Sequence, residues 1–275
     1  MSWAGEQVGL WRLARTGFVR REVLTAIGRV VLWERAGEGP PLVLLHGLGA
    51  RGSRLRPFVQ ALDLPNPIVL PDFPAHGDSQ PPDRMWVPSL VEGVEEATRE
   101  LGPAIWYGNS MGGYAAIKIA ALRPRTALGV FVSSPGGGAL SDDRRHQVME
   151  AFRVGGYGEA LALARAALPA TPDWQCRFLA LGVKYATGDP VVRQLVDSVG
   201  PHDDLTLRDM RALRMPTTVV WGTEERLLHP SQREWFRANL PGHASLIEPE
   251  GMGHAAWFEH THELADMFRA FVRSV

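Results

Sequence analysis

An apolar run that ends in the pattern Gly-x-Ser-x-Gly constrains this chain more than any other feature. The run covers residues 104–107, the pattern reads Gly108-Asn109-Ser110-Met111-Gly112, and a stretch of helix-forming residues follows at once. This succession predicts a strand, a sharp turn and a helix, with Ser110 at the apex. The glycines leave room in a strained turn, so the hydroxyl can stand clear of the sheet at the positive end of a helix. We therefore expect Ser110 to be a nucleophile.

The size and composition of the chain allow one large α/β domain with an inserted lobe. The chain has 275 residues, of which 45% are hydrophobic, and this is enough for a substantial core. The formal net charge is −1, so no global field favours nucleic acid as a partner. The single cysteine, Cys176, excludes an internal disulfide framework and a zinc-finger type of site, and it suits a reducing compartment.

The start of the chain shows no targeting signal and one unusual pattern. The first residues lack the basic and apolar regions of a signal peptide, and no apolar run approaches the roughly 20 residues that span a bilayer. We therefore expect a cytoplasmic protein without a transmembrane segment. Residues 1–21 mix apolar side chains with arginines. This mixture predicts either a basic amphipathic helix on a membrane surface or a segment that packs on the body of the protein.

Short apolar runs that alternate with helical patterns predict an α/β fold with a mostly parallel sheet. The expected strands cover residues 22–34 (as one or two strands), 42–45, 67–70, 105–107, 128–132, 217–221 and 245–247. The expected helices of this core cover residues 89–101, 111–122 and 259–273.

One long stretch breaks the alternation. Between residues 137 and 209 the sequence offers helical runs but no convincing strand. The runs cover residues 141–153, 157–168, 173–186 and 189–198. We interpret residues 137–209 as a helical cap inserted between two parts of an α/β core, residues 1–136 and 210–275. An ordinary long crossover between strands is the alternative.

A nucleophilic serine needs a base, and the base needs a group that orients it. His254 is the best candidate for the base, because it lies on a glycine-rich loop between the last predicted strand and the final helix. His202, His229 and His243 also lie near loops, and His229 is the main rival.

The acid is expected directly after the predicted strand 217–221. Two neighbouring carboxylates follow the turn there, and we favour Glu225, with Glu224 as its competitor. Both could instead be surface charges beside Arg226. Glutamate can replace aspartate in this role, since the carboxylate only holds the histidine tautomer and stabilises the imidazolium.

An oxyanion intermediate requires two N–H donors that are already in position. The backbone amide of Met111 is one candidate, because it follows the nucleophile at the start of a helix. The second is the backbone amide of Leu48, in the loop after the predicted strand 42–45. His46 precedes this loop, and we interpret it as a hydrogen-bonding scaffold rather than a base.

Five motifs in chain order carry a resemblance to a known family. They are Leu44-Leu45-His46-Gly47, then Pro71-Asp72-Phe73-Pro74-Ala75-His76-Gly77-Asp78-Ser79, then Gly108-Asn109-Ser110-Met111-Gly112-Gly113, then Trp221-Gly222-Thr223-Glu224-Glu225, and Gly253-His254. From about residue 22 onward the chain resembles the α/β-hydrolase fold superfamily, whose order of serine, acid and histidine it shares. The resemblance implies a sheet of the eight-stranded type with flanking helices and an inserted cap, and a structural role for the turn at residues 71–79.

Within the superfamily, the compact chain with a helical cap is similar to bacterial carboxylesterases, monoacylglycerol-type lipases and hydrolases of carbon–carbon bonds in ring-fission products. Epoxide hydrolases and haloalkane dehalogenases have an aspartate nucleophile, so Ser110 disfavours them. A long Gly-Gly-Gly oxyanion motif is absent, which disfavours enzymes like hormone-sensitive lipase. Most of the similar enzymes have aspartate where this chain has glutamate, which leaves the choice between Glu225 and Glu224 open.

We expect a serine hydrolase that cleaves small carboxylic esters of apolar acyl or aromatic groups, with no metal or organic cofactor. The cap supplies apolar side chains for its own core and for a pocket: Phe152, Leu161, Leu163, Leu168, Trp174, Phe178, Leu179 and Leu181. Hydrolysis of carbon–carbon bonds or lactones on the same triad is one alternative. A non-catalytic protein that binds a small ligand with this fold is the other.

Overall fold

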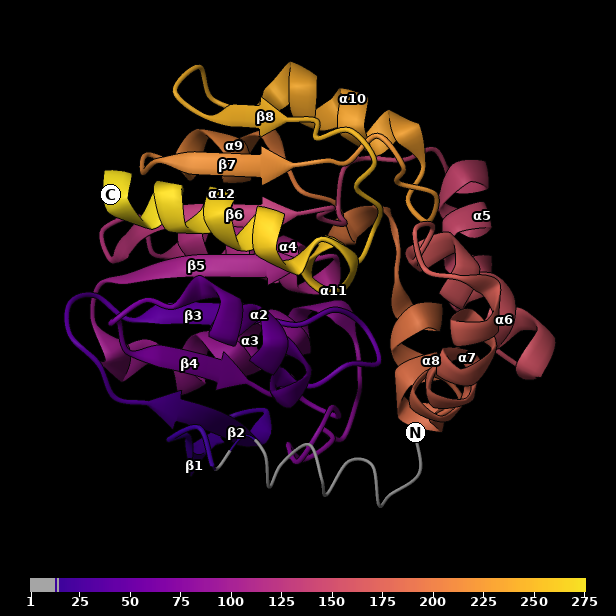
Figure 1. The fold of residues 1–275 in the computed structure, drawn as a ribbon, viewed down its shortest axis with the longest axis horizontal. Coiled ribbons are helices and arrows are strands. Elements are labelled where there is room, and N and C mark those ends of the chain that lie inside the picture. The colour runs from indigo at the N-terminus through magenta and orange to yellow at the C-terminus, as the bar shows by residue number, and fades with distance from the viewer. Residues whose placement is uncertain (1–12, 14) are drawn as a thin grey trace.

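Eight strands form one sheet at the centre of the molecule, in the order β1-β2-β4-β3-β5-β6-β7-β8 (Figure 1). The computed structural model describes residues 13 and 15–275. The strands are β1 (Val19–Thr25), β2 (Gly28–Arg35), β3 (Leu42–Leu45), β4 (Ile68–Pro71), β5 (Ala104–Asn109), β6 (Ala127–Ser133), β7 (Thr217–Val220) and β8 (Ser245–Ile247). Strand β2 runs antiparallel to both β1 and β4, and the other neighbours are parallel. The predicted fold class is confirmed.

Side chains of the central strands alternate between two apolar cores, one on each face of the sheet. In β3, Val43 and Leu45 belong to the core on the face that helix α4 (Met111–Leu122) covers. Leu42 and Leu44 belong to the core on the other face, which helix α12 (Thr261–Ser274) covers. All four side chains are fully buried. Because both faces are covered, the strand is a continuous apolar run rather than an alternating one.

The flanking helices divide between the two faces. One core includes side chains of α3 (Val87–Ala97), α4 (Met111–Leu122), α9 (Leu207–Ala212) and α10 (Pro230–Asn239). The other includes side chains of α2 (Arg56–Leu62), α11 (Ala256–Glu259) and α12 (Thr261–Ser274). The described residues also form three short 3-10 helices: Gly52–Leu55, Arg99–Leu101 and Pro201–Asp203.

Four helices between β6 and β7 lie beyond the carboxyl ends of the parallel strands, at the right of Figure 1. They are α5 (Asp142–Phe152), α6 (Tyr157–Ala167), α7 (Asp173–Thr187) and α8 (Pro190–Ser198), and we call them the cap helices. Helix α9 is joined to α4 instead, by an ion pair of 2.8 Å between Lys118 and Asp209. The division of the chain into domains at residues 137 and 209 stays a prediction.

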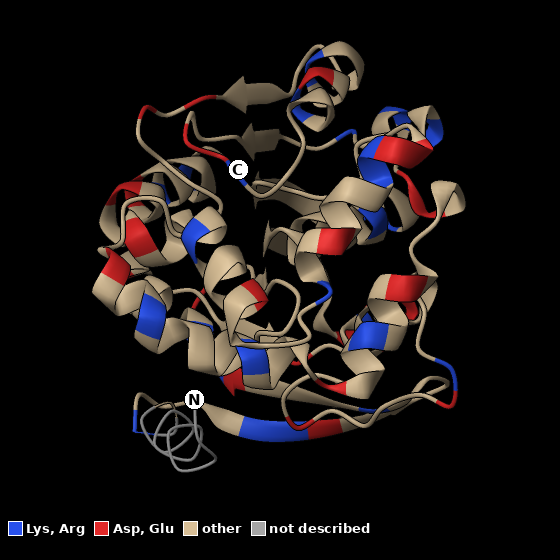
Figure 2. Ribbon diagram, turned by 90° about the vertical axis from the view of Figure 1, so that its right-hand side faces the viewer, with Lys and Arg blue, Asp and Glu red and all other residues tan. Residues whose placement is uncertain are grey.

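Most of the predicted extension at residues 1–21 lies outside the described residues. Of its described part, Leu13 and Phe18 are buried in the core under α12. No helix of the described chain is both long and apolar enough to cross a bilayer. On the side of the molecule that faces the viewer in Figure 2, basic and acidic residues are interspersed rather than gathered into patches of one sign.

Candidate active site

Ser110 occupies a strained turn between β5 and α4. Its backbone has φ 56° and ψ −120°, a positive φ that residues with a side chain rarely adopt. Two glycines permit the turn: a Cβ on Gly108 would lie 2.1 Å from the carbonyl oxygen of Gly112, and a Cβ on Gly112 would lie 2.3 Å from that of Leu45. The Ser110 N–H donates to the carbonyl of Ser133 on β6 (3.1 Å). The backbone therefore holds the serine at the carboxyl end of the sheet, at the start of α4.

His254 and Glu225 form a buried pair on two loops at the same end of the sheet. His254 Nδ1 lies 2.9 Å from Glu225 Oε2, and both side chains are almost completely buried. The other carboxylate oxygen, Oε1, accepts the backbone N–H groups of Leu227 (2.8 Å) and Leu228 (2.9 Å). Burial opposes ionisation of Glu225, but His254 and the hydrogen bonds outweigh it and lower the pKa of this carboxyl.

A serine that the sequence did not single out also contacts this carboxylate. The Ser134 hydroxyl donates to Glu225 and helps to lower its pKa. Ser134 follows β6 directly, is buried, and has a positive φ of 43°. The only signal in the sequence was its place at the end of a predicted strand.

The other candidates for base and acid have different partners. Glu224 pairs with Arg226 at the surface. His229 caps α10, where its Nδ1 accepts the N–H of Ser231 (3.1 Å). His243 lies at the amino end of the sheet, 3.2 Å from the carbonyl of Met215, and the side chain of His202 is 69% exposed.

Asn109 joins the serine turn to the histidine loop. Its amide Nδ2 donates to the backbone carbonyl of His254 (2.9 Å) and to that of Ser133 (3.0 Å). Its Oδ1 accepts the indole N–H of Trp257 (3.2 Å). A single buried side chain thus fixes the loop of His254 against the residue next to Ser110. Sequence reasoning assigned Asn109 no role.

The loop after β3 lies against the serine turn and carries Leu48. A Cβ on Gly47 would lie 3.5 Å from Ser110 Cβ, so the two segments are in contact. Leu48 lines the same cavities as Ser110. Met111 is the first residue of α4, and the first N–H groups of a helix have no partner within it. Both predicted N–H donors therefore belong to segments that border Ser110.

His46 is part of the scaffold under this loop. Its Nδ1 lies 2.8 Å from the carbonyl of Gly47, and its Nε2 accepts the N–H of Phe73 (3.3 Å). Complete burial, with a smaller contribution from His76, lowers the pKa of His46 to about 3, so the ring is neutral. In the neighbouring turn at residues 71–79, the Asp72 carboxylate accepts the N–H groups of Gly52 (2.7 Å) and Asp78 (3.0 Å). These bonds hold the turn together and fix it to the segment after β3.

Two cavities meet at Ser110. The larger one, which we call the outer groove, lies between the cap helices and the core and has a volume of about 670 Å³. His254 and Leu48 line it together with Ser110. Six of the eight apolar cap residues named from the sequence form much of its wall: Phe152, Leu163, Leu168, Phe178, Leu179 and Leu181.

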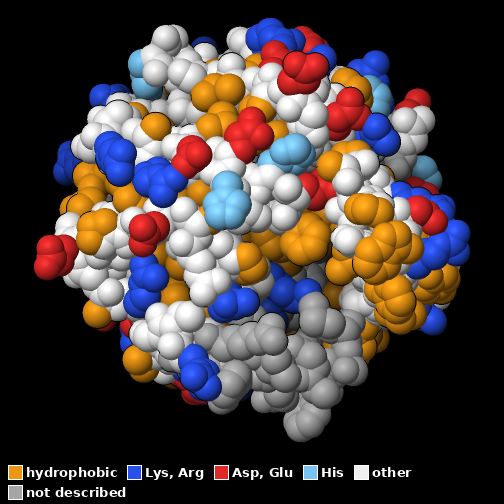
Figure 3. Space-filling view, viewed as in Figure 1, with side chains coloured by type: hydrophobic (Ala, Val, Ile, Leu, Met, Phe, Trp, Pro, Cys, Tyr) orange, Lys and Arg blue, Asp and Glu red, His pale blue; other side chains and the backbone are white. Residues whose placement is uncertain are grey.

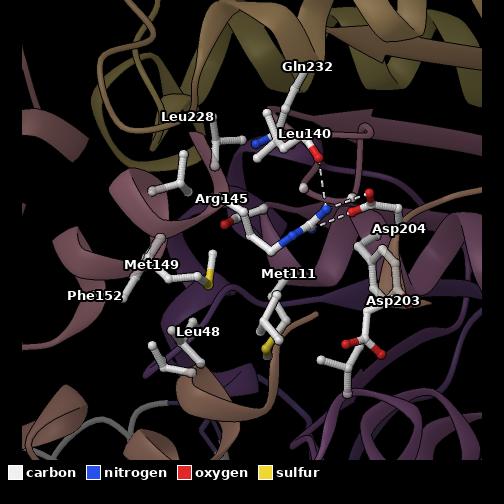
Figure 4. A pocket seen from close by; sticks show the side chains of 18 of the residues that line it. Leu48, Met111, Leu140, Arg145, Met149, Phe152, Asp203, Asp204, Leu228 and Gln232 are labelled. Atoms are coloured by element: carbon white, nitrogen blue, oxygen red, sulfur yellow. Dashed lines mark hydrogen bonds and ion pairs between the residues drawn. The ribbon is translucent and has the colours of Figure 1, made fainter. Parts of the chain in front are cut away.

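The smaller one, which we call the inner cavity, has a volume of about 130 Å³. Ser110, Met111 and Leu48 line it together with apolar residues of α3, α5 and α8. Its polar lining residues are Tyr114, Arg145, Asp203, Asp204 and Gln232. In Figure 4, Arg145, Asp204 and Gln232 lie together on one side of the cavity, and Leu48, Met149 and Phe152 lie on the other.

The cap is less buried than expected. Of the eight apolar cap residues named from the sequence, only Phe152, Leu161 and Leu163 are buried. Trp174 and Phe178 on α7 are 61% and 69% exposed, so neither side chain belongs to the core of the cap. Apolar side chains gather over the cap at the right of Figure 3. Trp174 lines neither cavity, so the expectation for this residue is wrong.

The described residues contain no group of three or more His, Cys, Asp or Glu side chains that could hold a metal ion. Near Ser110, His254 is paired with Glu225, and Asn109 accepts the indole N–H of Trp257.

The sequence and the fold both match those of known hydrolases. The model of the alpha/beta hydrolase family matches residues 42–267, and the chain belongs to this family. It is 30% identical over 261 residues to the pimeloyl-[acyl-carrier protein] methyl ester esterase of Xanthomonas campestris pv. campestris (strain B100), an alignment that covers 87% of this chain and 97% of the esterase.

Two solved structures illustrate the similarity of fold. A bacterial membrane phospholipase A has a TM-score of 0.79 at 23% identity, over 98% of this chain and 94% of the phospholipase. The 2-hydroxy-6-oxo-6-phenylhexa-2,4-dienoate hydrolase from Rhodococcus sp. strain RHA1 has a TM-score of 0.79 at 19% identity, over 93% of this chain and 99% of that hydrolase. At such identities these structures share the fold with this protein, and the fold alone.

Proposed function

We propose that this protein is a serine esterase, which cleaves carboxylic esters through an acyl-enzyme on Ser110. The observation that carries the proposal is the buried pair of His254 and Glu225, 2.9 Å apart, whose histidine lines the same groove as Ser110. A histidine held by a carboxylate beside a serine is the arrangement that makes a hydroxyl nucleophilic. The relative named as a methyl ester esterase supports an ester as the substrate.

In the proposed reaction, His254 Nε2 takes the proton of Ser110 as its Oγ attacks the carbonyl carbon of the ester. Glu225 holds the Nδ1–H, so that Nε2 is free to accept this proton, and its charge stabilises the imidazolium. The backbone N–H groups of Met111 and Leu48 donate to the oxyanion. His254 then protonates the leaving alcohol, and the same imidazole takes a proton from the water that releases the acid.

The walls of the outer groove favour an apolar substrate. Leucines and aromatic side chains of α6, α7 and α11 line it, and such walls bind acyl chains or rings by removing their surface from water. This supports esters with an apolar acyl or aromatic part over sugars or highly charged compounds.

The test is hydrolysis of p-nitrophenyl esters with acyl chains of increasing length, together with labelling by a fluorophosphonate. We expect Ser110→Ala to lower kcat by roughly 10⁴-fold or more and to abolish labelling. Ser141→Ala is the matched control, because Ser141 is exposed and its side chain does not cap α5. Full ester turnover by Ser110→Ala would contradict the proposal.

The same experiment separates the alternatives. A wild-type protein that neither turns over an ester nor reacts with the fluorophosphonate would favour a non-catalytic binding protein. Lactones and ring-fission dienones in the substrate panel distinguish hydrolysis of these compounds from hydrolysis of open-chain esters, because the three reactions share the nucleophile and the base.

A further inference from the structure

Two residues that line the inner cavity each have one buried polar atom without a hydrogen-bond partner among the described residues. These atoms are Arg145 Nε, a donor, and Gln232 Oε1, an acceptor. Arg145 is 7% exposed and Gln232 is 2% exposed, and both line the cavity with Ser110. A buried donor or acceptor without a partner costs about 1–3 kcal/mol. Two of them on residues of one cavity wall therefore indicate that something else fills their hydrogen bonds.

The charge of Arg145 is already balanced. Its two terminal nitrogens donate to the two carboxylate oxygens of Asp204 at 2.6 and 2.8 Å, and one of them also donates to the carbonyl of Leu140 (3.0 Å). Asp203 lines the same cavity and adds a second carboxylate. An anionic group would meet this negative charge, so the free donor and the free acceptor suit a neutral partner.

A hydroxyl group has both functions that these atoms lack: its oxygen can accept an N–H such as that of Arg145 Nε, and its proton can go to an oxygen such as Gln232 Oε1. We propose that the inner cavity binds the acyl part of the ester substrate and that Arg145 and Gln232 recognise a hydroxyl group on that acyl chain. This inference rests on the proposed function and names the substrate class of the same site.

The position of His254 assigns the acyl part to the inner cavity. His254 lines the outer groove, and it is not among the described residues that line the inner cavity. The leaving oxygen must receive a proton from His254, so the alcohol part extends into the outer groove. The volume of about 130 Å³ is close to that of a cavity of about 150 Å³ that holds benzene. It therefore suits a short acyl chain.

The first experiment compares two sets of ethyl esters. In one set the acid has a hydroxyl on its third, fourth, fifth or sixth carbon, and in the other a methyl group replaces that hydroxyl. Rates are corrected for the reaction without enzyme. We expect kcat/KM at one position to favour the hydroxyl ester by at least about tenfold, because a site built to hydrogen-bond a hydroxyl rejects the analogue that lacks it. Esters with a terminal carboxylate should be poorer substrates than either.

The second experiment removes the acceptor. Gln232→Met keeps the length of the side chain without its amide, and the ratio of kcat/KM between hydroxyl and methyl esters should fall towards one. Met149→Leu is the matched control, since it alters an apolar residue of the same cavity at similar volume, and it should keep the ratio. If Gln232→Met does not fold, the comparison of substrates with the wild-type protein still decides.

Different failures point to different conclusions. If unsubstituted esters are hydrolysed but no hydroxyl ester is preferred, the inference is wrong and the proposed function stands. Preference for a carboxylate, or for a hydroxyl on the alcohol part instead of the acyl part, also overturns the inference. A wild-type protein that hydrolyses none of these esters contradicts the inference and the proposed function together.

Discussion

Two adjacent glutamates follow β7, and the turn that contains them gives them opposite surroundings. Glu225 points inward, where His254, Ser134 and two backbone N–H groups surround its carboxylate. Glu224 is directed outward, and its side chain is 43% exposed beside Arg226. Burial with hydrogen-bond partners makes Glu225 a fixed charge, whereas solvent screens Glu224.

This difference predicts unequal effects of the same substitution. Glu225→Gln keeps an oxygen that can accept the N–H groups of Leu227 and Leu228 but removes the charge beside His254. We expect kcat for ester hydrolysis to fall by roughly 10²–10⁴-fold, while Glu224→Gln changes it less than about threefold. Steady-state kinetics of both variants at neutral pH measure the ratio. Equal effects would mean that Glu225 has no special role.

Asn109 leads to a second prediction at this scale. Asn109→Ala removes the side-chain donor of the His254 carbonyl and the acceptor of the Trp257 indole N–H, whereas the Ser133 carbonyl keeps the N–H of Ser110. We expect the free energy of unfolding to fall by about 1–3 kcal/mol and kcat to fall with it, because the loop of His254 loses its attachment. Urea unfolding and kinetics on the same preparation measure both. Trp257→Phe, which removes only the indole N–H, should cost less, and a larger cost for it would contradict this account.

At the scale of residues, the sequence predicted the types and the order of the groups at the site but not their bonds. Short motifs marked Ser110 and His254 because glycines and strand ends accompany them. Glu224 and Glu225 both follow the strand at the position expected for the acid, and nothing in the local sequence distinguishes them. The partners of Asn109 and Ser134 come from segments far away in the chain, so their roles depend on the folded structure.

The loop after β3 begins with a buried histidine, His46, whose packing makes the stability of the protein depend on pH. Burial, with His76 and Arg51 nearby, lowers the pKa of His46 to about 3, whereas histidine in an unfolded chain titrates near pH 6.5. Between these pH values the unfolded chain binds a proton that the folded protein does not bind. Stability therefore falls as the pH decreases from about 6.5 towards 3, by at most about 1.4 kcal/mol per pH unit for this group.

His46→Gln removes this titration, since glutamine stays neutral. We expect the variant to be less stable than the wild type at pH 7.5, because it cannot reproduce both hydrogen bonds of the ring. From pH 6.5 to 5.0 the wild type should then lose about 2 kcal/mol more of its unfolding free energy than the variant does. Urea denaturation across this range provides the values, and parallel pH dependences of the two proteins would refute the assignment.

At the scale of elements, buried strands were predicted within one or two residues, since each is an apolar run with breakers at its ends. Residues 22–34 proved to be parts of the hairpin of β1 and β2, which pair from Val19 with Glu34 to Thr25 with Gly28. Helices α2 and α10 were not predicted. Helix α2 has only seven residues, and α10 is rich in charged residues and buries only Gln232 and Phe236, so the apolar pattern of each is faint.

At the scale of the whole molecule, the cap is attached beside the histidine loop. The N–H of Ala255 donates to the carbonyl of Ala167 at the end of α6 (3.1 Å), and the Thr171 hydroxyl donates to Glu259 (2.7 Å). The alternation of strands and helices predicted the core, and the lack of strands predicted the cap helices. The sequence could not predict where the cap touches the core, because this contact joins segments almost ninety residues apart.

Substitution of Gly253 tests whether this contact positions His254, the proposed base. A Cβ at residue 253 would lie 2.4 Å from Cγ and 2.5 Å from Cδ of Pro169, two atoms of a rigid ring in the cap. Gly253→Ala must therefore displace either the cap or the loop of His254. We expect the free energy of unfolding to fall by about 1–3 kcal/mol, as in other overpacked sites, and kcat/KM to fall as well.

Pro169→Ala removes the two clashing ring atoms, so a double-mutant cycle separates a cap contact from a local effect on the loop. If the clash with the cap displaces His254, the double variant recovers most of the stability and activity that Gly253→Ala loses, with a coupling of at least about 1 kcal/mol. If the effects of Gly253→Ala and Pro169→Ala on stability and activity are additive, the first substitution acts on the loop itself and not through the cap. The cap would then form a wall of the outer groove without helping to hold His254.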